Sequence, residues 1–268
     1  MKAPDKNTIK ALVRTAVESY AQGFRARHEG EVDNPEGTIN MKIHNVFIEV
    51  LGKEVQYYTA LVRSLDSSLG NMLEGLAINI ASLSFEVKRN VEGPLGVEQT
   101  RIIAELLEKY KRREIKPIIT HYQTLRSFAD KDKAPLKRHD SDYCLIDRET
   151  DTHYLIELKI GGDLDSKKAR SEKEAILEQF AILSNVLPPE SNIKIFFATA
   201  YNRYGENKQW RQERVRQFFA DDELLIGKDF WNFVCRSNEG YEAVLEAYRE
   251  SAPLIKQALD SIKKTYLG

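Results

Sequence analysis

Two carboxylates and one amine stand close together in the chain, around a pair of short apolar runs. Asp142 begins the run DYCLID over residues 142–147, and Glu157-Leu158-Lys159 lies within the run HYLIELKI over residues 153–160. The polar segment RETDT between the runs favours a turn, so the sequence predicts a β-hairpin. Because side chains alternate along a strand, Glu157 and Lys159 share one face and Leu158 points toward the core. The hairpin brings Asp142 beside that pair.

This combination of side chains suits the metal-dependent hydrolysis of a phosphodiester. That reaction needs a nucleophilic water, neutralisation of charge on the transition state, and stabilisation of a departing alkoxide. Mg²⁺ prefers oxygen ligands and keeps several waters, so Asp142, Glu157 and the backbone carbonyl of Ile160 are its expected ligands. Lys159 is expected to orient the attacking water and to offset charge on the phosphate.

Other residues compete for this site or support it. Asp140 competes with Asp142 because both stand at the entrance to the first strand, and Asp142 is preferred because it directly abuts the apolar run. Glu74 in the segment GNMLEGLA, and Gln179 beside Glu178 on a later helix, are candidates for supporting roles. Each of these is also consistent with an ordinary solvated helix face.

The Glu-x-Lys spacing is weak evidence by itself, because 30% of the residues are charged. The alternative is that the acidic and basic residues of the hairpin form only a surface ion pair, worth less than about 1 kcal/mol. We expect only the triplet at 157–159 to have strands around it. The other triplets lie in helix-like, basic or loop-like stretches and are Glu86-Val87-Lys88, Glu114-Ile115-Lys116 and Glu206-Asn207-Lys208.

The pattern of apolar residues predicts the elements that position this site. Helices are expected over residues 7–26, 39–50, 54–65, 68–86, 97–113, 166–186 and 210–220, and from 229 to the end. Strands are expected in the hairpin, at 193–199 and at 224–226. The strand, helix and strand succession after residue 153 suits a parallel crossover. The predicted fold class is therefore α/β, with a central mixed β-sheet flanked by helices and a helical N-terminal region.

Three regions are expected within a single compact unit. Residues 1–66 are a helical region with a possible role in dimerisation or DNA binding, residues 67–236 are the catalytic core, and residues 237–268 are a C-terminal helix packed on that core. Cys144 and Cys235 lie in apolar stretches and are expected to be small buried hydrophobes, not zinc ligands. Without an apolar run of about 20 residues or a signal peptide, the protein is expected to be cytoplasmic and not membrane-bound.

The chain has 40 basic and 41 acidic residues, so bulk charge does not favour nucleic acid binding. Its basic residues are nevertheless clustered, and a groove lined for phosphates is expected near the site. The three clusters are Lys109, Lys111, Arg112, Arg113 and Lys116; Lys131, Lys133, Lys137, Arg138 and His139; and Arg203, Lys208, Arg211, Arg214 and Arg216.

A loop rich in amide, aromatic and basic side chains follows the strand at 193–199. Arg and Lys suit guanine, Asn and Gln suit adenine, and aromatic rings pack against sugars or bases. The alternative is a polar surface loop with Trp210 in the core. The candidate DNA-binding residues are Tyr201, Asn202, Arg203, Asn207, Lys208, Gln209 and Arg211.

These motifs resemble known families. Asp142 with Glu157-x-Lys159 resembles the PD-(D/E)XK nuclease signature, with Ser141 at the position of the proline. The stretches from RHDSDYCLID to KEAILEQ and from FFATAYNRYGE to IGKDFWNFV resemble the TdeIII-type family of type II restriction endonucleases over residues 68–235. The segment GGDLDSKKA is the more specific part, together with AYNRYGE and IGKDFWNF.

The resemblance implies Mg²⁺-dependent cleavage of double-stranded DNA at a short palindrome by a homodimer, leaving 5′-phosphate ends. It also implies GGNCC as a target and a cognate DNA methyltransferase as a separate protein. A repair or recombination nuclease with the same core, and a non-catalytic DNA-binding module, remain the alternatives.

Overall fold

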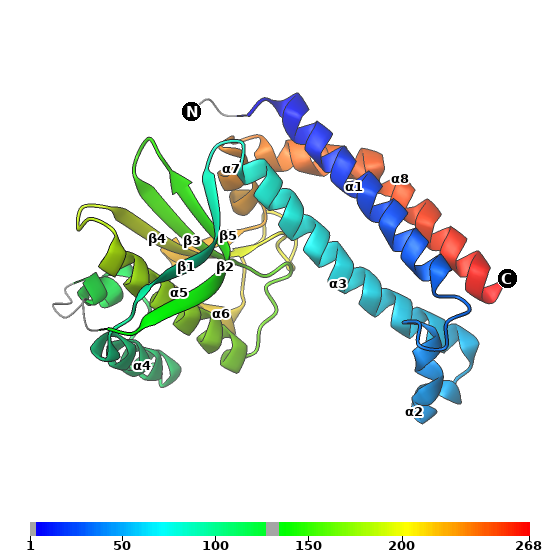
Figure 1. The fold of residues 1–268 in the computed structure, drawn as a ribbon, viewed down its shortest axis with the longest axis horizontal. Helices are drawn as coiled ribbons and strands as arrows, with labels where there is room; N and C mark the ends of the chain where they lie inside the picture. The colour runs from blue at the N-terminus through cyan, green and yellow to red at the C-terminus, as the bar shows by residue number, and fades with distance from the viewer. Residues whose placement is uncertain (1–3, 127–133) are drawn as a thin grey trace. The chain divides into compact units, whose positions relative to one another are not determined.

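The computed structural model describes residues 4–126 and 134–268, with only the backbone of Ser141 and Asp142. The chain divides into two compact units (Figure 1). One, here called the helical unit, contains residues 5–79 and 242–268, and the other, the core unit, contains residues 80–241. In this division residues 242–268 group with the N-terminal helices, and the packing of the C-terminal helix on the core stays a prediction.

The helical unit contains α1 (Lys6–Gly30), η1 (Asn40–His44), α2 (Val46–Glu49), α3 (Lys53–Ala81) up to residue 79, and α8 (Gly240–Leu267) from residue 242. Ion pairs join α1 to α8, at 2.6 Å between Lys10 and Glu246 and 2.7 Å between Arg14 and Glu250. The predicted break near Ser68 is wrong, because its hydroxyl donates to the Ser64 carbonyl at 2.7 Å and α3 continues. Among the described residues, no helix is long and apolar enough to cross a bilayer.

The core unit is built on a sheet with the strand order β1-β2-β3-β4-β5. The strands are β1 (Glu86–Pro94), β2 (Leu136–Asp147), β3 (Thr152–Leu158), β4 (Asn192–Thr199) and β5 (Leu224–Ile226). Strands β1, β2 and β3 pair antiparallel, which confirms the hairpin, and β3, β4 and β5 pair parallel. α5 (Ser166–Val186) forms the crossover from β3 to β4. The predicted α/β class with a mixed sheet is confirmed.

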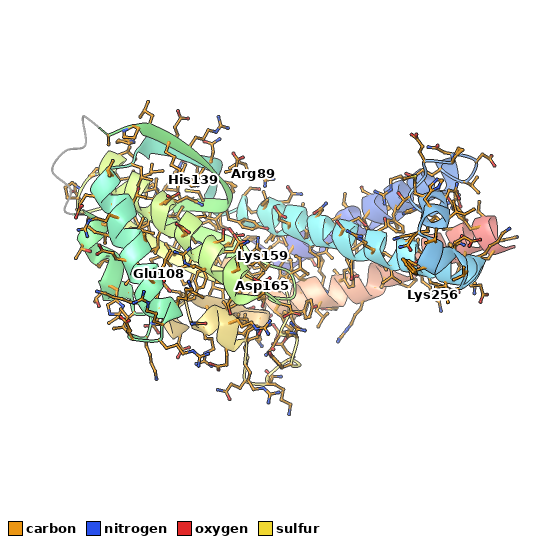
Figure 2. All side chains as sticks on the ribbon, turned by 90° about the horizontal axis from the view of Figure 1, so that it is seen from below. Arg89, Glu108, His139, Lys159, Asp165 and Lys256 are labelled. Carbon is orange, nitrogen blue, oxygen red and sulfur yellow. The ribbon has the colours of Figure 1, made fainter. Side chains whose placement is uncertain are left out.

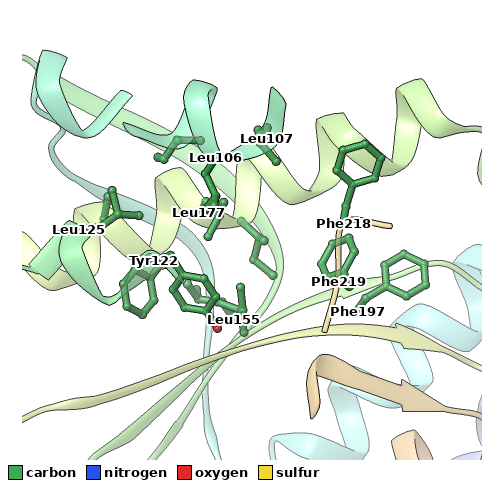
Figure 3. Close-up of a cluster of buried hydrophobic side chains, with 14 of the residues drawn as sticks. Leu106, Leu107, Tyr122, Leu125, Leu155, Leu177, Phe197, Phe218 and Phe219 are labelled. Carbon is green, nitrogen blue, oxygen red and sulfur yellow. The ribbon is translucent and has the colours of Figure 1, made fainter. Parts of the chain in front are cut away.

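Helices cover both faces of this sheet. On one face, α4 (Val97–Lys111), η2 (Ile119–Arg126) and α5 enclose a buried cluster that includes Tyr122, Leu155 and Phe197 (Figure 3). On the other, α7 (Lys228–Cys235) packs its Phe233 ring 5.0 Å from that of Tyr154. The chain between β4 and β5 holds two short elements, α6 (Glu213–Arg216) and η4 (Asp221–Glu223).

Both cysteines are buried, as predicted. Cys144 is 1% exposed and Cys235 is 0% exposed. Burial raises the pKa of Cys144 to about 11 and that of Cys235 to about 12. Both are therefore thiols at neutral pH, and they pack as small apolar side chains.

Strand β1 is the main correction to the predicted elements. The sequence predicted a helix that ends at residue 86, but Glu86 begins this edge strand, and Glu86-Val87-Lys88 also lies in a paired strand. The charged sequence EVKRNVEGP lacks the apolar alternation of a half-buried strand. The helices predicted over 39–50 and 210–220 are also shorter, with α2 and α6 each four residues long.

Candidate active site

The ends of β2 and β3 bring two of the predicted residues opposite each other. Tyr143 pairs with Ile156 in the antiparallel register of these strands. One residue earlier on β2 is Asp142, and one residue later on β3 is Glu157. Continuing this register directs the backbone of Asp142 toward that of Glu157, and the meeting of their side chains stays a prediction.

A bulge in β2 lies at the same place. β1 pairs with β2 at Lys88↔Cys144 and again at Asn90↔Asp140. One residue of β1, Arg89, therefore stands opposite residues 141–143 of β2. Such bulges bend a strand and re-aim its side chains, and they are frequent beside active sites.

Glu157 and Lys159 meet on one face of the sheet. Their side chains form an ion pair and are 11% and 31% exposed. The amide of Lys159 donates to the Ala198 carbonyl at 2.9 Å, which carries the β-ladder past the end of β3. This register fixes the alternation that puts both side chains on the α5 side, together with Leu155 of the buried cluster.

A second carboxylate reaches the same amine from α5. Glu172 Oε1 lies 3.2 Å from Lys159 Nζ, and its side chain is 24% exposed. Lys159 lies close to the N-terminal end of this helix, where Asp165 caps it by accepting from the Lys168 amide at 2.8 Å (Figure 2). Glu172 was not among the residues predicted from the sequence. Its place in the second turn of the helix that follows β3 is a signal that could have found it.

Further along α5, Glu178 is paired with the other end of β2. Its Oε2 lies 2.7 Å from Lys137 Nζ and 2.8 Å from His139 Nε2. The neighbouring Gln179 is 3% exposed, and its side-chain oxygen is buried without a hydrogen-bond partner among the described residues. An unsatisfied buried acceptor costs about 1–3 kcal/mol, so a bound water or cation near Gln179 would be stabilised.

The remaining predicted acidic residues are Asp140 and Glu74. The Asp140 side chain is 94% exposed, at 4.0 Å from Arg138, which favours Asp142 for the site. Glu74 lies on α3 in the helical unit, so its supporting role stays a prediction.

The backbone oxygens after Glu157 point to opposite sides of β3. The carbonyl of Ile160 accepts from the Ala200 amide at 3.1 Å and is directed toward β4. The Lys159 amide points toward β4, where it donates to the Ala198 carbonyl. The Leu158 carbonyl belongs to the same trans peptide and points the opposite way, toward β2. The carbonyl on the Asp142 side is therefore that of Leu158, and not the predicted one of Ile160.

The turn after β3 is tied to the loop after β4. Asp163 accepts from Gln212 at 2.7 Å and pairs with Arg203 at 2.6 Å, and the hydrogen bond from Arg203 lowers the pKa of Asp163. Gly162 has φ +63°, and a Cβ there would lie 2.6 Å from Thr199 Cγ2. The tight turn therefore requires this glycine.

The seven candidate DNA-binding residues differ in how they are used. Asn202 is occupied within the loop: its amide donates to the Lys208 carbonyl at 2.7 Å and its oxygen accepts from the Tyr204 amide at 3.0 Å. The Arg211 guanidinium lies 4.9 Å from the centre of the Tyr204 ring. The residues with exposed side chains are Tyr201, Arg203, Asn207, Lys208, Gln209 and Arg211. Trp210 is 7% exposed, as the alternative interpretation of this loop expected.

The three basic clusters are described to different extents. From the first and third, Arg113, Lys116 and Arg216 line one cavity of about 540 Å³. From the second, Lys137 and His139 face Glu178, whereas Lys131 and Lys133 lie outside the described residues.

The donor chemistry fits a hard cation. Among the residues whose side chains are described, no group of three His, Cys, Asp or Glu side chains is arranged to hold a metal ion. The Asp142 side chain is outside that set, and the described carboxylates on the Glu157 face of the sheet are those of Glu157 and Glu172, which both contact Lys159. Carboxylate and carbonyl oxygens are the ligands that Mg²⁺ prefers.

One comparison with known proteins identifies a family. Residues 5–252 match the model of a family described as type II restriction endonuclease, HinfI. No curated protein matches the sequence. The family match covers most of both units and includes every residue of the site described above.

Proposed function

Since the chain belongs to the HinfI family of type II restriction endonucleases, we propose that it cleaves both strands of DNA at a short palindrome. As a member of this family it is a site-specific deoxyribonuclease, and DNA is its substrate. We add that Mg²⁺ is the cofactor, that the products carry 5′-phosphates, and that a homodimer does the cutting. A two-fold symmetric dimer suits a palindrome because each subunit reads one half-site.

The proposed mechanism assigns one task to each side chain. Asp142 and Glu157 hold the metal, with the Leu158 carbonyl as the backbone ligand on the same side. Bound Mg²⁺ supplies a positive centre that neutralises charge on the scissile phosphate and lowers the pKa of a water. Lys159 orients the attacking water and stabilises the developing negative charge. The observation that carries this proposal is the Lys159 ammonium, held between Glu157 and Glu172 beside the β2 bulge.

Glu172 positions Lys159 in this mechanism. A flexible lysine side chain loses several rotamers when it is held in one geometry. Contacts with two carboxylates from different elements restrict the ammonium before DNA binds. Such preorganisation is what makes a charged group effective on a transition state.

The resemblance to the TdeIII type supports two further proposals, one for the recognition sequence and one for how the host DNA is protected from cleavage. GGNCC is the proposed recognition sequence, and a separate DNA methyltransferase would protect the host sites. Sequencing the ends of the cleaved fragments tests the first, and the neighbouring reading frame tests the second.

The function is tested by digesting plasmid DNA of known sequence with the purified protein, with and without magnesium. Discrete and reproducible fragments that require the metal support restriction. Ragged or structure-dependent cuts would support a repair or recombination nuclease instead. Metal-dependent binding of DNA without any cut would favour a non-catalytic module and contradict the proposal.

One further expected result concerns the loop after β4. Lys208 is exposed in this loop, so Lys208→Ala should weaken DNA binding and lower the slope of log affinity against log salt by about 1. Lys256→Ala, at an exposed position on α8, is the control and should leave the slope unchanged. Fluorescence anisotropy over a salt series measures both. An unchanged slope for Lys208→Ala would exclude a phosphate contact there.

A further inference from the structure

The helical unit carries an exposed apolar surface that its own fold does not explain. It lies on η1, on α2 and on the start of α3, which are side by side in Figure 1. The Gln56 amide donates to the Glu49 carbonyl at 3.3 Å and links α3 to α2. This surface is called the α2 patch, and its members with their exposed fractions are Met41 47%, Ile43 56%, Val46 64%, Phe47 82%, Val50 74%, Leu51 61%, Tyr58 42% and Val62 54%.

The spacing of the members on α3 places them on one face of the helix. Tyr58 and Val62 are one helical turn apart on α3, while their neighbours Tyr57 and Leu61 face inward at 1% and 6% exposure. The helix is thus apolar on its buried face and again on its outer one. A helix that is apolar on both faces is expected to be covered on both.

The area of the α2 patch matches what a protein partner needs. Its eight side chains expose roughly 800 Å², given about 150–250 Å² for a large side chain. The largest apolar patch on a typical monomer is about 300–600 Å². A standard protein interface buries about 800 Å² on each partner. The patch is therefore of the size of one side of a stable interface.

Its charges suit a second copy of the same chain. In a two-fold interface the same surface meets itself, so charged groups on it need partners of the opposite sign on the same surface. The polar residues around the α2 patch include Lys42 and Lys53 as well as Glu49 and Glu54. A cavity of about 520 Å³, lined by Ile43, Lys53 and Tyr57 among others, borders the patch and offers a place for a projecting side chain.

We propose that the α2 patch is the surface through which two copies of this chain dimerise, with Phe47 as the anchor. The inference rests on the proposed cleavage of a palindrome by a homodimer, in which each of two symmetric subunits reads one half-site. It goes beyond that function because it assigns the contact to eight residues of the helical unit. Phe47 is the most exposed of them, and exposed aromatic side chains are frequent centres of binding energy at interfaces.

The test is the mass of the protein in solution, measured by light scattering after gel filtration. It is measured without DNA and with duplex DNA, in a buffer without divalent metal so that the DNA is not cut. The wild type should have about twice the chain mass of 30.8 kDa at micromolar concentrations. Phe47→Glu places a charge in the contact and should raise the dimer dissociation constant at least about 100-fold. Its thermal unfolding should be unchanged, because the side chain is exposed in the monomer.

Val97→Glu is the matched control, because Val97 is 80% exposed but lies on α4 in the core unit. This variant should remain dimeric. A monomeric wild type under both conditions, or a dimeric Phe47→Glu, would overturn the assignment. Plasmid digestion separates this result from the function: a wild type that dimerises but never cuts would contradict restriction alone, and a cutting wild type with a dimeric Phe47→Glu would contradict the α2 patch alone.

Discussion

Lys159→Ala is expected to cut plasmid DNA at least about 100-fold more slowly than the wild type at saturating magnesium. The Lys159 ammonium lies on the Glu157 face of the sheet at the end of β3, where ion pairs with Glu157 and Glu172 hold it. Without it, the phosphate loses a charge-stabilising group while the proposed metal ligands remain. DNA binding should change little, because the exposed loop after β4 is untouched. Single-turnover digestion and fluorescence anisotropy measure the two effects.

Lys88→Ala is the matched control for this variant. Lys88 closes the other Glu-x-Lys triplet that lies in a strand, and it is exposed on β1 with Glu86 3.9 Å away. The Lys88→Ala variant should cut plasmid DNA at the wild-type rate. Equal rates for Lys159→Ala and the wild type would remove Lys159 from the mechanism, and equal losses in both variants would point to a general effect of strand lysines.

Glu223→Gln is expected to lower the free energy of unfolding by about 3–5 kcal/mol, which is the usual cost of breaking a buried ion pair. Lys173 Nζ donates to both oxygens of Glu223, at 2.8 and 2.7 Å, and the two side chains are 0% and 1% exposed. Tyr122 also donates to this carboxylate, at 2.8 Å, and the Ala220 amide does so at 2.7 Å. Burial lowers the pKa of Lys173, and the charge of Glu223 opposes that shift. Guanidinium unfolding measures the loss.

Lys111→Met provides the comparison for the buried pair. Lys111 lies 3.5 Å from Glu108 on α4, and the two side chains are 60% and 39% exposed. Removing this surface pair should cost less than about 1 kcal/mol. A loss as small as this in Glu223→Gln would show that the buried pair does not hold the η4 segment to α5.

The hairpin could be predicted because its signal is local. Apolar and β-branched residues on both sides of a polar turn define β2 and β3, and the alternation along β3 puts Glu157 and Lys159 on one face. The crossover to β4 follows from the same reasoning, since a helix separates two apolar strands. These conclusions need no knowledge of distant contacts.

Strand β1 could not be predicted in this way. Residues 86–94 include charged side chains and Gly93, and they are held by pairing with β2 some 50 residues later. Edge strands exposed on one side do not need an apolar alternation. The β2 bulge opposite Arg89 arises from the pairing of β1 with β2. Because β1 could not be predicted from the sequence, the bulge beside the candidate site could not be predicted either.

Glu172 was missed for a related reason. On the sequence it is one of several charged residues in the helix SKKARSEKEAILEQ, and helical spacing alone does not say which of them faces β3. The packing of α5 on the sheet decides this, and it directs Glu172 to Lys159 and Glu178 to His139. Asn202 is the opposite case, because the sequence predicted a role for it in DNA binding. Its side-chain amide, which could pair with adenine, instead donates to the Lys208 carbonyl of its own loop.

The metal-binding role of Glu157 is tested most directly by titrating Mn²⁺ into protein bound to plasmid DNA, with heat as the readout. All proteins in the experiment carry Lys159→Ala, so that cleavage of the DNA is slow during the titration, and gel electrophoresis afterwards measures how much DNA remains uncut. Adding Glu157→Gln or Asp142→Asn should weaken Mn²⁺ binding at least about 10-fold, whereas adding Glu86→Gln should leave it unchanged. Equal Mn²⁺ affinity in the Glu157, Asp142 and Glu86 variants would contradict a metal site at the end of β2 and β3.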